Sequence, residues 1–186
     1  MSTQRLDFKR IVAAYAAIVT ISLPAVAQDA TDQELLQQLQ TAEPEQTARI
    51  TDRLIDQWSK SGSAAMDLLL RRGRDALEVQ QPGLAIEHLT ALTDHAPDFA
   101  EGWHTLALAY FHADMFGPAV DALEHTLALN PQHFGALQGL AAILEVTDQP
   151  ALAYRVYREV EKITPHDPDV QEAIARLAPL IDGTAL

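Results

Sequence analysis

The sequence predicts an all-α protein in which antiparallel helix pairs stack into a solenoid that a C-terminal helix closes. Two observations carry this prediction. Ala and Leu dominate the 186 residues while Val and Ile are sparse, a composition that favours helices over strands. Pro97, Pro131 and Pro165 recur at a spacing of 34 residues, a period typical of repeated helical hairpins.

Other positions recur with the same period and share a side-chain size. The small ones are Gly73, Ala107 and Ala141, and then Ala85, Ala119 and Ala153. The large ones are Leu69, Trp103 and Leu137, and then Leu89, Leu123 and Tyr157. Small side chains at fixed positions predict close contacts between helices, where a bulkier residue would cost about 1–3 kcal/mol.

The middle unit has the clearest pattern: Trp103, Leu106, Ala107, Tyr110, Ala119, Leu123 and Pro131. It resembles the tetratricopeptide repeat family. The first unit departs from the family pattern, with Arg72 in place of Leu and Ala76 in place of the aromatic residue. The resemblance covers about Met66 to Asp167 and implies three repeats, at about 66–99, 100–133 and 134–167. It implies repeat-packing roles for Gly73, Ala85, Trp103, Ala107, Tyr110, Ala119, Leu123, Pro131, Ala141, Ala153 and Tyr157.

The expected helices follow from these units and from their start and stop signals. They cover 63–79, 83–95, 99–113, 118–129, 132–146, 150–163 and 168–180, within a repeat region of 63–182 whose last helix is a cap. Asp98 with Glu101 predicts a capping pair, and Asp167 before Pro168 predicts an N-cap. Residues 28–62 hold a short helix around Leu35 to Leu39 and another at about 45–60, which form a degenerate repeat or a cap. Residues 28–31 are expected to be frayed.

The first 27 residues have the layout of a secretory signal peptide. Arg5, Lys9 and Arg10 precede an apolar stretch, and Ala25 and Ala27 form an A-x-A cleavage site. This predicts a periplasmic protein with no stable membrane insertion after cleavage. The alternative is an uncleaved N-terminal segment that anchors the protein in the inner membrane.

Composition and motifs exclude several kinds of chemistry. Cysteine is absent, so there is neither a disulfide scaffold nor a thiolate ligand. The net charge of −13 disfavours a nucleic-acid partner. No HExxH, serine elbow or glycine-rich phosphate loop is present. The serines around Gly62 indicate a turn, and the seven histidines are interpreted as scattered polar residues. We therefore expect no enzyme, cofactor or metal site.

The remaining candidate is a binding surface. In the tetratricopeptide family the first helices of the repeats line a concave groove that holds a protein or peptide partner. Counting along these helices gives the groove candidates Leu70, Arg71, Arg74, His104, Leu108, Phe111, His112 and Gln138. The basic start and apolar middle of this set suit a segment with an apolar anchor and an acidic residue. The alternative for Arg71, Arg72 and Arg74 is a solvated helix face.

One subclass of the family clamps a C-terminal carboxylate with Lys, Asn and Arg. Here the matching places hold Leu70, Arg74, Thr105, Gly135 and Gly139, so an acidic chaperone tail is not the expected partner. The sequence thus predicts an interaction scaffold in the cell envelope. Two alternatives stay open: a repeat protein that associates with itself, and a metal-binding protein that uses His104 and His112.

Overall fold

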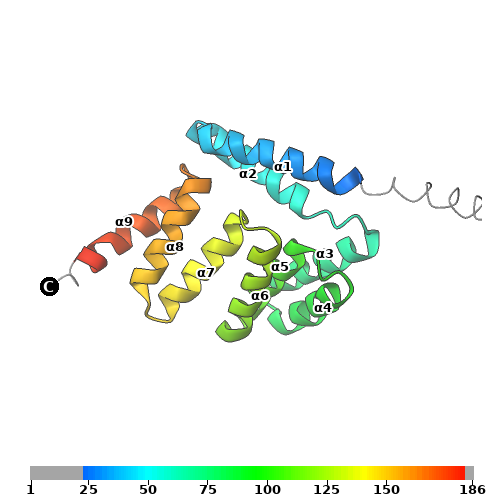
Figure 1. The fold of residues 1–186 in the computed structure, drawn as a ribbon. Helices are drawn as coiled ribbons and strands as arrows, with labels where there is room; N and C mark the ends of the chain where they lie inside the picture. The colour runs from blue at the N-terminus through cyan, green and yellow to red at the C-terminus, as the bar shows by residue number, and fades with distance from the viewer. Residues whose placement is uncertain (1–22, 183–186) are drawn as a thin grey trace, which may run out of the picture. The chain divides into compact units, whose positions relative to one another are not determined.

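A computed structural model describes the backbone of residues 23–182 and the side chains of residues 31–181. This part of the chain contains nine α-helices and no strand (Figure 1). The helices are α1 (Leu23–Thr41), α2 (Pro44–Trp58), α3 (Ala64–Glu78), α4 (Pro82–His95), α5 (Ala100–His112), α6 (Phe116–Leu129), α7 (Phe134–Val146), α8 (Pro150–Ile163) and α9 (Pro168–Asp182). The predicted all-α class is confirmed. Most of the predicted signal peptide, residues 1–22, lies outside the described residues.

The chain divides into two compact units inside α1, after Glu34. The described part of the first unit is the helical segment from Leu23 to Glu34. The second unit, from Leu35 onward, holds the rest of α1 and all later helices. In this second unit α3 packs on α4, α5 on α6 and α7 on α8, and each pair packs on the next through α4 and α5 or α6 and α7.

The small residues of the 34-residue period lie where the helices meet. Ala85, Ala119 and Ala153 are completely buried, and so is Ala141. At Gly73 even one methyl group is too large, because a Cβ there would lie 2.5 Å from the Cγ of Leu89. Two apolar clusters follow, one joining the first pair to α5 and one joining the second pair to α7.

The turns inside the three pairs share one backbone device. Gln80, Asp114 and Asp148 have φ values of 56°, 56° and 58°, and they stand 34 residues apart. After each of them the next residue donates its N–H to the carbonyl five residues back, as Gln81 does to Ala76 at 2.8 Å. This is the Schellman ending of a helix, whose left-handed residue is usually glycine. The period thus repeats a conformation that the side chains themselves do not reveal.

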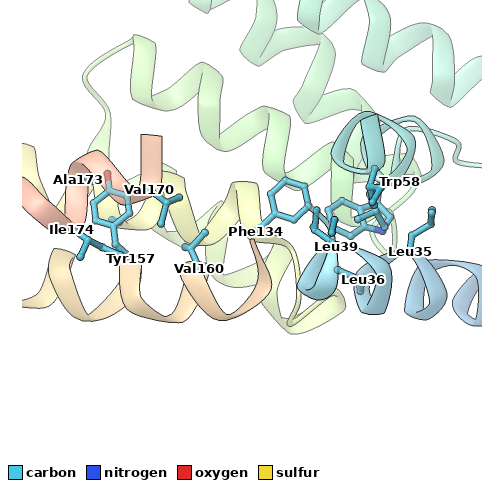
Figure 2. Packing of buried hydrophobic residues seen from close by; sticks show 14 of the residues in the cluster. Leu35, Leu36, Leu39, Trp58, Phe134, Tyr157, Val160, Val170, Ala173 and Ile174 are labelled. Carbon is cyan, nitrogen blue, oxygen red and sulfur yellow. The ribbon is translucent and has the colours of Figure 1, made fainter. Parts of the chain in front are cut away.

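A third apolar cluster ties the N-terminal hairpin to the last repeat. Leu35, Leu39 and Trp58 belong to the same buried cluster as Phe134. Figure 2 shows the Trp58 indole beside the Phe134 ring, and their centroids lie 5.2 Å apart. The part of α1 after Glu34 and the whole of α2 are therefore held by the repeat region.

The C-terminal helix α9 closes the stack through apolar and polar contacts. Val170 and Leu177 are buried, and the Asp167 carboxylate accepts N–H bonds from Asp169 and Val170, which confirms the predicted N-cap. Arg176 pairs with Glu145 of α7. Burial and the hydrogen bond that it donates to Glu145 raise the pKa of Tyr157 to about 12.

Several local expectations are wrong. The N-cap of α5 is Phe99, which makes no side-chain capping bond, and Glu101 turns into the protein instead of capping with Asp98. Helix α6 begins at Phe116 rather than at residue 118, because proline is tolerated in a first turn. Residues 28–31, expected to be frayed, lie inside α1. Trp103 is only partly buried; its indole N–H donates to the Pro97 carbonyl at 2.8 Å.

We predict that Gly73→Ala destabilises the protein by about 1–3 kcal/mol, although alanine is the better helix former. The reason is the clash of the new Cβ with Leu89. Urea unfolding measures the change. Gly83→Ala is the matched control, because a Cβ at Gly83 meets nothing within 4 Å. Equal effects of the two substitutions would contradict this account.

We predict that Gln80→Gly raises the free energy of unfolding by about 0.5–1 kcal/mol, because glycine adopts the left-handed conformation without strain. Thermal or urea unfolding measures the gain. Glu87→Gly, on the exposed side of α4, should instead lower it by about 1 kcal/mol. A loss of stability in Gln80→Gly would refute the strain argument.

Candidate functional site: a groove with a buried ionic floor

The second unit contains a groove of about 760 Å³. The first helix of each pair contributes to it, and α2, α8 and α9 supply the remaining walls. The lining residues are Ile55, Trp58, Arg74, Leu77, Glu78, Glu101, His104, Thr105, Leu108, His112, His133, Phe134, Gly135, Gln138, Gly139, Ala142, Tyr157, Asp169 and Val170. The helix faces that were counted from the sequence thus converge on one hollow.

The groove candidates have different positions in the structure. Those that line the hollow are Arg74, His104, Leu108, His112 and Gln138. Leu70 is 2% exposed and belongs to the core between the first two pairs. Arg71 is exposed and is not part of the lining, as is Arg72, so for these two residues the solvated-face interpretation is correct.

Phe111 lines a small adjoining pocket of about 90 Å³ instead of the main groove. Leu108, Gly139 and Ala142 line both the groove and this pocket. The other lining side chains are Ala107, Leu123 and Ile143, so all the walls are apolar or glycine. The pocket is therefore an apolar recess that opens beside the groove floor.

A buried carboxylate lies at the centre of the groove floor. Glu101 is 4% exposed, and its Oε1 accepts a hydrogen bond from Nη2 of Arg74 at 2.5 Å. The Nδ1 of His104 lies 3.4 Å from the same oxygen. The Nε2 of His133 lies 3.0 Å from Oε2. A buried charge needs such partners, because an isolated carboxylate would lose its hydration without compensation.

The hydrogen bonds of His133 fix its tautomer. His133 is the N-cap of α7, and its Nδ1 accepts the N–H of Ala136 at 3.1 Å. Nδ1 therefore carries no proton, and the neutral ring has its hydrogen on Nε2. That hydrogen points at Glu101, so His133 donates to the carboxylate while it caps the helix.

Burial and hydrogen bonding set the protonation states of this cluster. Burial opposes ionisation of Glu101, but the hydrogen bonds from His104 and His133 outweigh it and hold the pKa of the carboxyl well below its usual range. Burial lowers the pKa of His133. At neutral pH Glu101 is thus an anion and His133 is neutral.

The same cluster attaches the N-terminal hairpin to the repeats. Trp58 stacks on the His133 ring at a centroid distance of 4.7 Å. The hydroxyl of Ser59 accepts a hydrogen bond of 3.0 Å from Nη2 of Arg74. The end of α2 therefore contacts the cluster from one side, and its position depends on groups from three repeats.

The groove is acidic, which corrects the expected basic character. The charge of Arg74 is compensated by Glu101, and Arg71 is not part of the lining. Glu78 and Asp169 also line the groove, are exposed and have no ion pair within the described residues. The surplus charge is negative, so a partner with an acidic residue is the less favourable choice.

Glu101, His104 and His133 bring three donor atoms within 4.8 Å of one another. The metal alternative placed His104 with His112, whereas the structure places His104 with His133. The chemistry of His133 does not suit a metal ligand. Its Nδ1 faces the N–H of Ala136, so a metal on Nε2 would require an imidazolate ring.

Sequence reasoning missed Glu101 and His133 as the centre of the groove. The 34-residue period carried a weak signal, because Asp67, Glu101 and Asp169 occupy equivalent positions. Asp67 is also engaged, with its carboxylate accepting hydrogen bonds from Ser61. His133 is equivalent to the N-cap residues Phe99 and Asp167, which marks it as a cap rather than a scattered polar residue.

Comparison with known proteins identifies the family. A TPR repeat-containing protein of Rhizobium etli is 30% identical over 152 residues, which cover 82% of this chain and 74% of the relative. The chain therefore belongs to the tetratricopeptide repeat proteins, and the predicted resemblance is confirmed. No protein-family model matches the chain.

Solved structures support the same fold at low sequence identity. The first TPR domain of Spaghetti, bound to an HSP90 peptide, superposes with a TM-score of 0.61 at 19% identity over 64% of this chain and 95% of that domain. A crystal structure of MamA gives 0.59 at 22% identity over 74% of this chain and 82% of MamA. The fold is that of a protein-interaction scaffold. Among the helices that the structure describes, none has the length and apolar character needed to span a membrane.

We predict that His133→Asn makes the stability of the protein less dependent on pH between 7 and 5. Below pH 6.5 the unfolded state binds a proton at His133 that the native state does not, so wild-type stability falls by up to about 1.4 kcal/mol per pH unit in that range. Asparagine still caps α7 but does not titrate. The groups that face His133, namely Glu101, His104 and Arg74, remain in both proteins.

Urea unfolding at several pH values measures the two slopes. Glu101 acts only below its ordinary pKa of 4.5, because its native pKa is depressed, so it leaves this window unaffected. His95→Asn, at an exposed site in α4, controls for the removal of a histidine. Parallel curves for wild type and His133→Asn would contradict the assigned protonation state.

We predict that a tenfold excess of Zn²⁺ leaves the melting temperature of the protein unchanged, because the proton on His133 Nε2 occupies the ligand position. A ligand that binds only the native state must raise the melting temperature. An increase that is lost in His133→Asn would re-establish the metal alternative.

Proposed function

We propose that this protein is a non-catalytic scaffold of the bacterial cell envelope that holds a segment of a partner protein in the groove. The observation that carries the proposal is the preformed hollow of about 760 Å³ on the first helices of the repeats, with an apolar middle around Leu108, Phe134 and Ala142. A preformed surface lowers the ordering cost of binding, which favours recognition of an extended or helical segment.

The chemistry of the groove supports binding rather than catalysis. The ionisable groups on its floor are used by one another: Glu101 is bonded to Arg74 and His133. The Ser59 hydroxyl accepts a hydrogen bond from Arg74, which is a cation and not a general base. These groups fix the shape of the floor, and an acid–base pair for a reaction would need a group with an open proton site.

The envelope location rests on the signal-like pattern of residues 1–27. Residues 1–35 fused to alkaline phosphatase, which is active only after export, should give an active enzyme in a bacterial host. Replacing the apolar residues between Ile11 and Leu23 by polar ones should abolish that activity. An inactive fusion of normal abundance would reject the envelope proposal without affecting the scaffold proposal.

The partner differs from the one in the Spaghetti complex, which is an HSP90 peptide. In this chain Arg74, the cation of the groove floor, is occupied by Glu101 and Ser59. A partner carboxylate would have to compete with a buried ion pair, whose disruption costs about 3–5 kcal/mol. We therefore do not propose an acidic tail as the occupant.

We predict that a photo-crosslinking amino acid at Leu108 captures a discrete partner in cells. The same amino acid at Ala128, an exposed position on α6 outside the groove, should capture none. Ala142→Arg, which narrows the groove floor, should reduce the Leu108 adduct at least fivefold without lowering the melting temperature by more than a few degrees.

Adducts of equal yield from both positions would reject the groove as the binding surface. An adduct with twice the mass of the protein would favour the self-association alternative. Light scattering then separates the two cases, because self-association raises the mean mass with concentration and a scaffold for another protein stays monomeric.

A further inference from the structure

The groove has unequal charges that a partner must match. Arg74 and Glu101 cancel, while Glu78 of α3 and Asp169 of α9 line the hollow with no ion pair among the described residues. The histidine of the floor, His133, is held neutral by its hydrogen bonds. A cationic group in the groove would therefore gain Coulomb energy at low ionic strength, and an anionic group would lose it.

Gly139 supplies a second, independent observation. It lies in the interior of α7, where glycine weakens a helix relative to alanine. The packing of the fold explains other helical glycines, such as Gly73, where a Cβ would lie 2.5 Å from Leu89. At Gly139 the nearest atom, on Leu123, would lie 3.4 Å from a Cβ, an ordinary contact.

The missing side chain of Gly139 therefore leaves space that the fold itself does not use. That space lies where the groove joins the apolar recess of about 90 Å³ formed with Leu108 and Phe111. An apolar side chain of a bound segment can enter there, because nothing projects from α7 at that point.

We infer that the occupant of the groove is a basic segment with aliphatic side chains, one of which enters the recess at Gly139 while its cations face Glu78 and Asp169. This inference rests on the proposed binding function and names the chemical class of its partner. Gly139 is then the residue that determines specificity for the aliphatic anchor, and the two carboxylates determine specificity for charge.

Three synthetic peptides test the inference by fluorescence polarisation. The first, Gly-Lys-Val-Lys-Val-Lys-Gly with blocked ends and a fluorescein label, is basic and aliphatic. The second has Glu in place of Lys, and the third has Ser in place of Val. The first peptide should bind at least tenfold more tightly than either of the others, and its affinity should fall as salt rises.

Variants of the full chain locate the binding. Gly139→Ala should weaken binding of the first peptide at least fivefold while it raises the melting temperature by about 2–4 °C, since it improves the helix. Gly139→Leu should weaken binding further. Gly117→Leu is the control, because a Cβ at Gly117 meets nothing within 4 Å and this residue is outside the groove.

The charge is tested by the double variant Glu78→Gln and Asp169→Asn, which should weaken binding at least threefold. Its matched control removes two exposed carboxylates outside the groove, through Glu87→Gln and Asp94→Asn. Equal losses in both double variants would mean that binding follows net charge only and would overturn the inference.

Two further results would also overturn it. One is tighter binding of the Glu peptide that is lost in Gly139→Leu; the groove would then still be a binding site, but for the opposite class of partner. The other is no binding of the Lys–Val peptide at 1 mM. The scaffold proposal has its own test in the Leu108 adduct, so failure of the inference and failure of the proposed function are distinguishable.

Discussion

The fold depends on the close approach of neighbouring helices at positions that accept only small side chains. Ala85, Ala119 and Ala153 are completely buried at one such position, and Gly73 lies so close to Leu89 that a methyl group does not fit. Because the close approach recurs every 34 residues, each pair is set on the next in the same way. The first helices then face one hollow, and the groove is a consequence of this repeated spacing.

The buried ionic cluster adds a different kind of constraint. Hydrophobic packing would tolerate small shifts of one repeat against the next, whereas Glu101 must keep three polar partners that come from three repeats. Its burial is unfavourable by itself, and loss of one partner would leave an uncompensated charge. The cluster thus fixes the relative positions of α3, α5 and α7, and Trp58 and Ser59 extend this constraint to α2. The rigid floor is also the binding surface.

The sequence predicted most of the fold because its pattern is carried by packing, which depends on size and period. The helix at 150–163 coincides with α8, and other boundaries shift by one or two residues at frayed ends. The turns were less predictable. Gln80 and Asp148 adopt left-handed conformations that glycine usually signals, and the protein tolerates the strain where the adjoining helices hold the ends of the turn.

The site was predicted in outline and missed at its centre. Helical counting placed Arg74, His104 and Leu108 on one face, since that depends on the helix period alone. It could not give the partners of Glu101, because a contact between α5 and the N-cap of α7 joins residues that are 32 positions apart. The charge of a groove is set by such pairs. Arg74 reads as a cation in the sequence and acts as half of a neutral pair in the fold.

The position of the ion pair has a consequence for how a groove of this fold acquires a partner class. A cation that projects freely from the first repeat would favour acidic segments, and most of the chain's own surface, with a net charge of −13, would then repel the same segments. Burying Glu101 against Arg74 removes this conflict, because the groove and the surface around it then have the same sign. Electrostatic steering and binding in the groove favour the same class of partner, and the apolar recess at Gly139 selects among its members by shape.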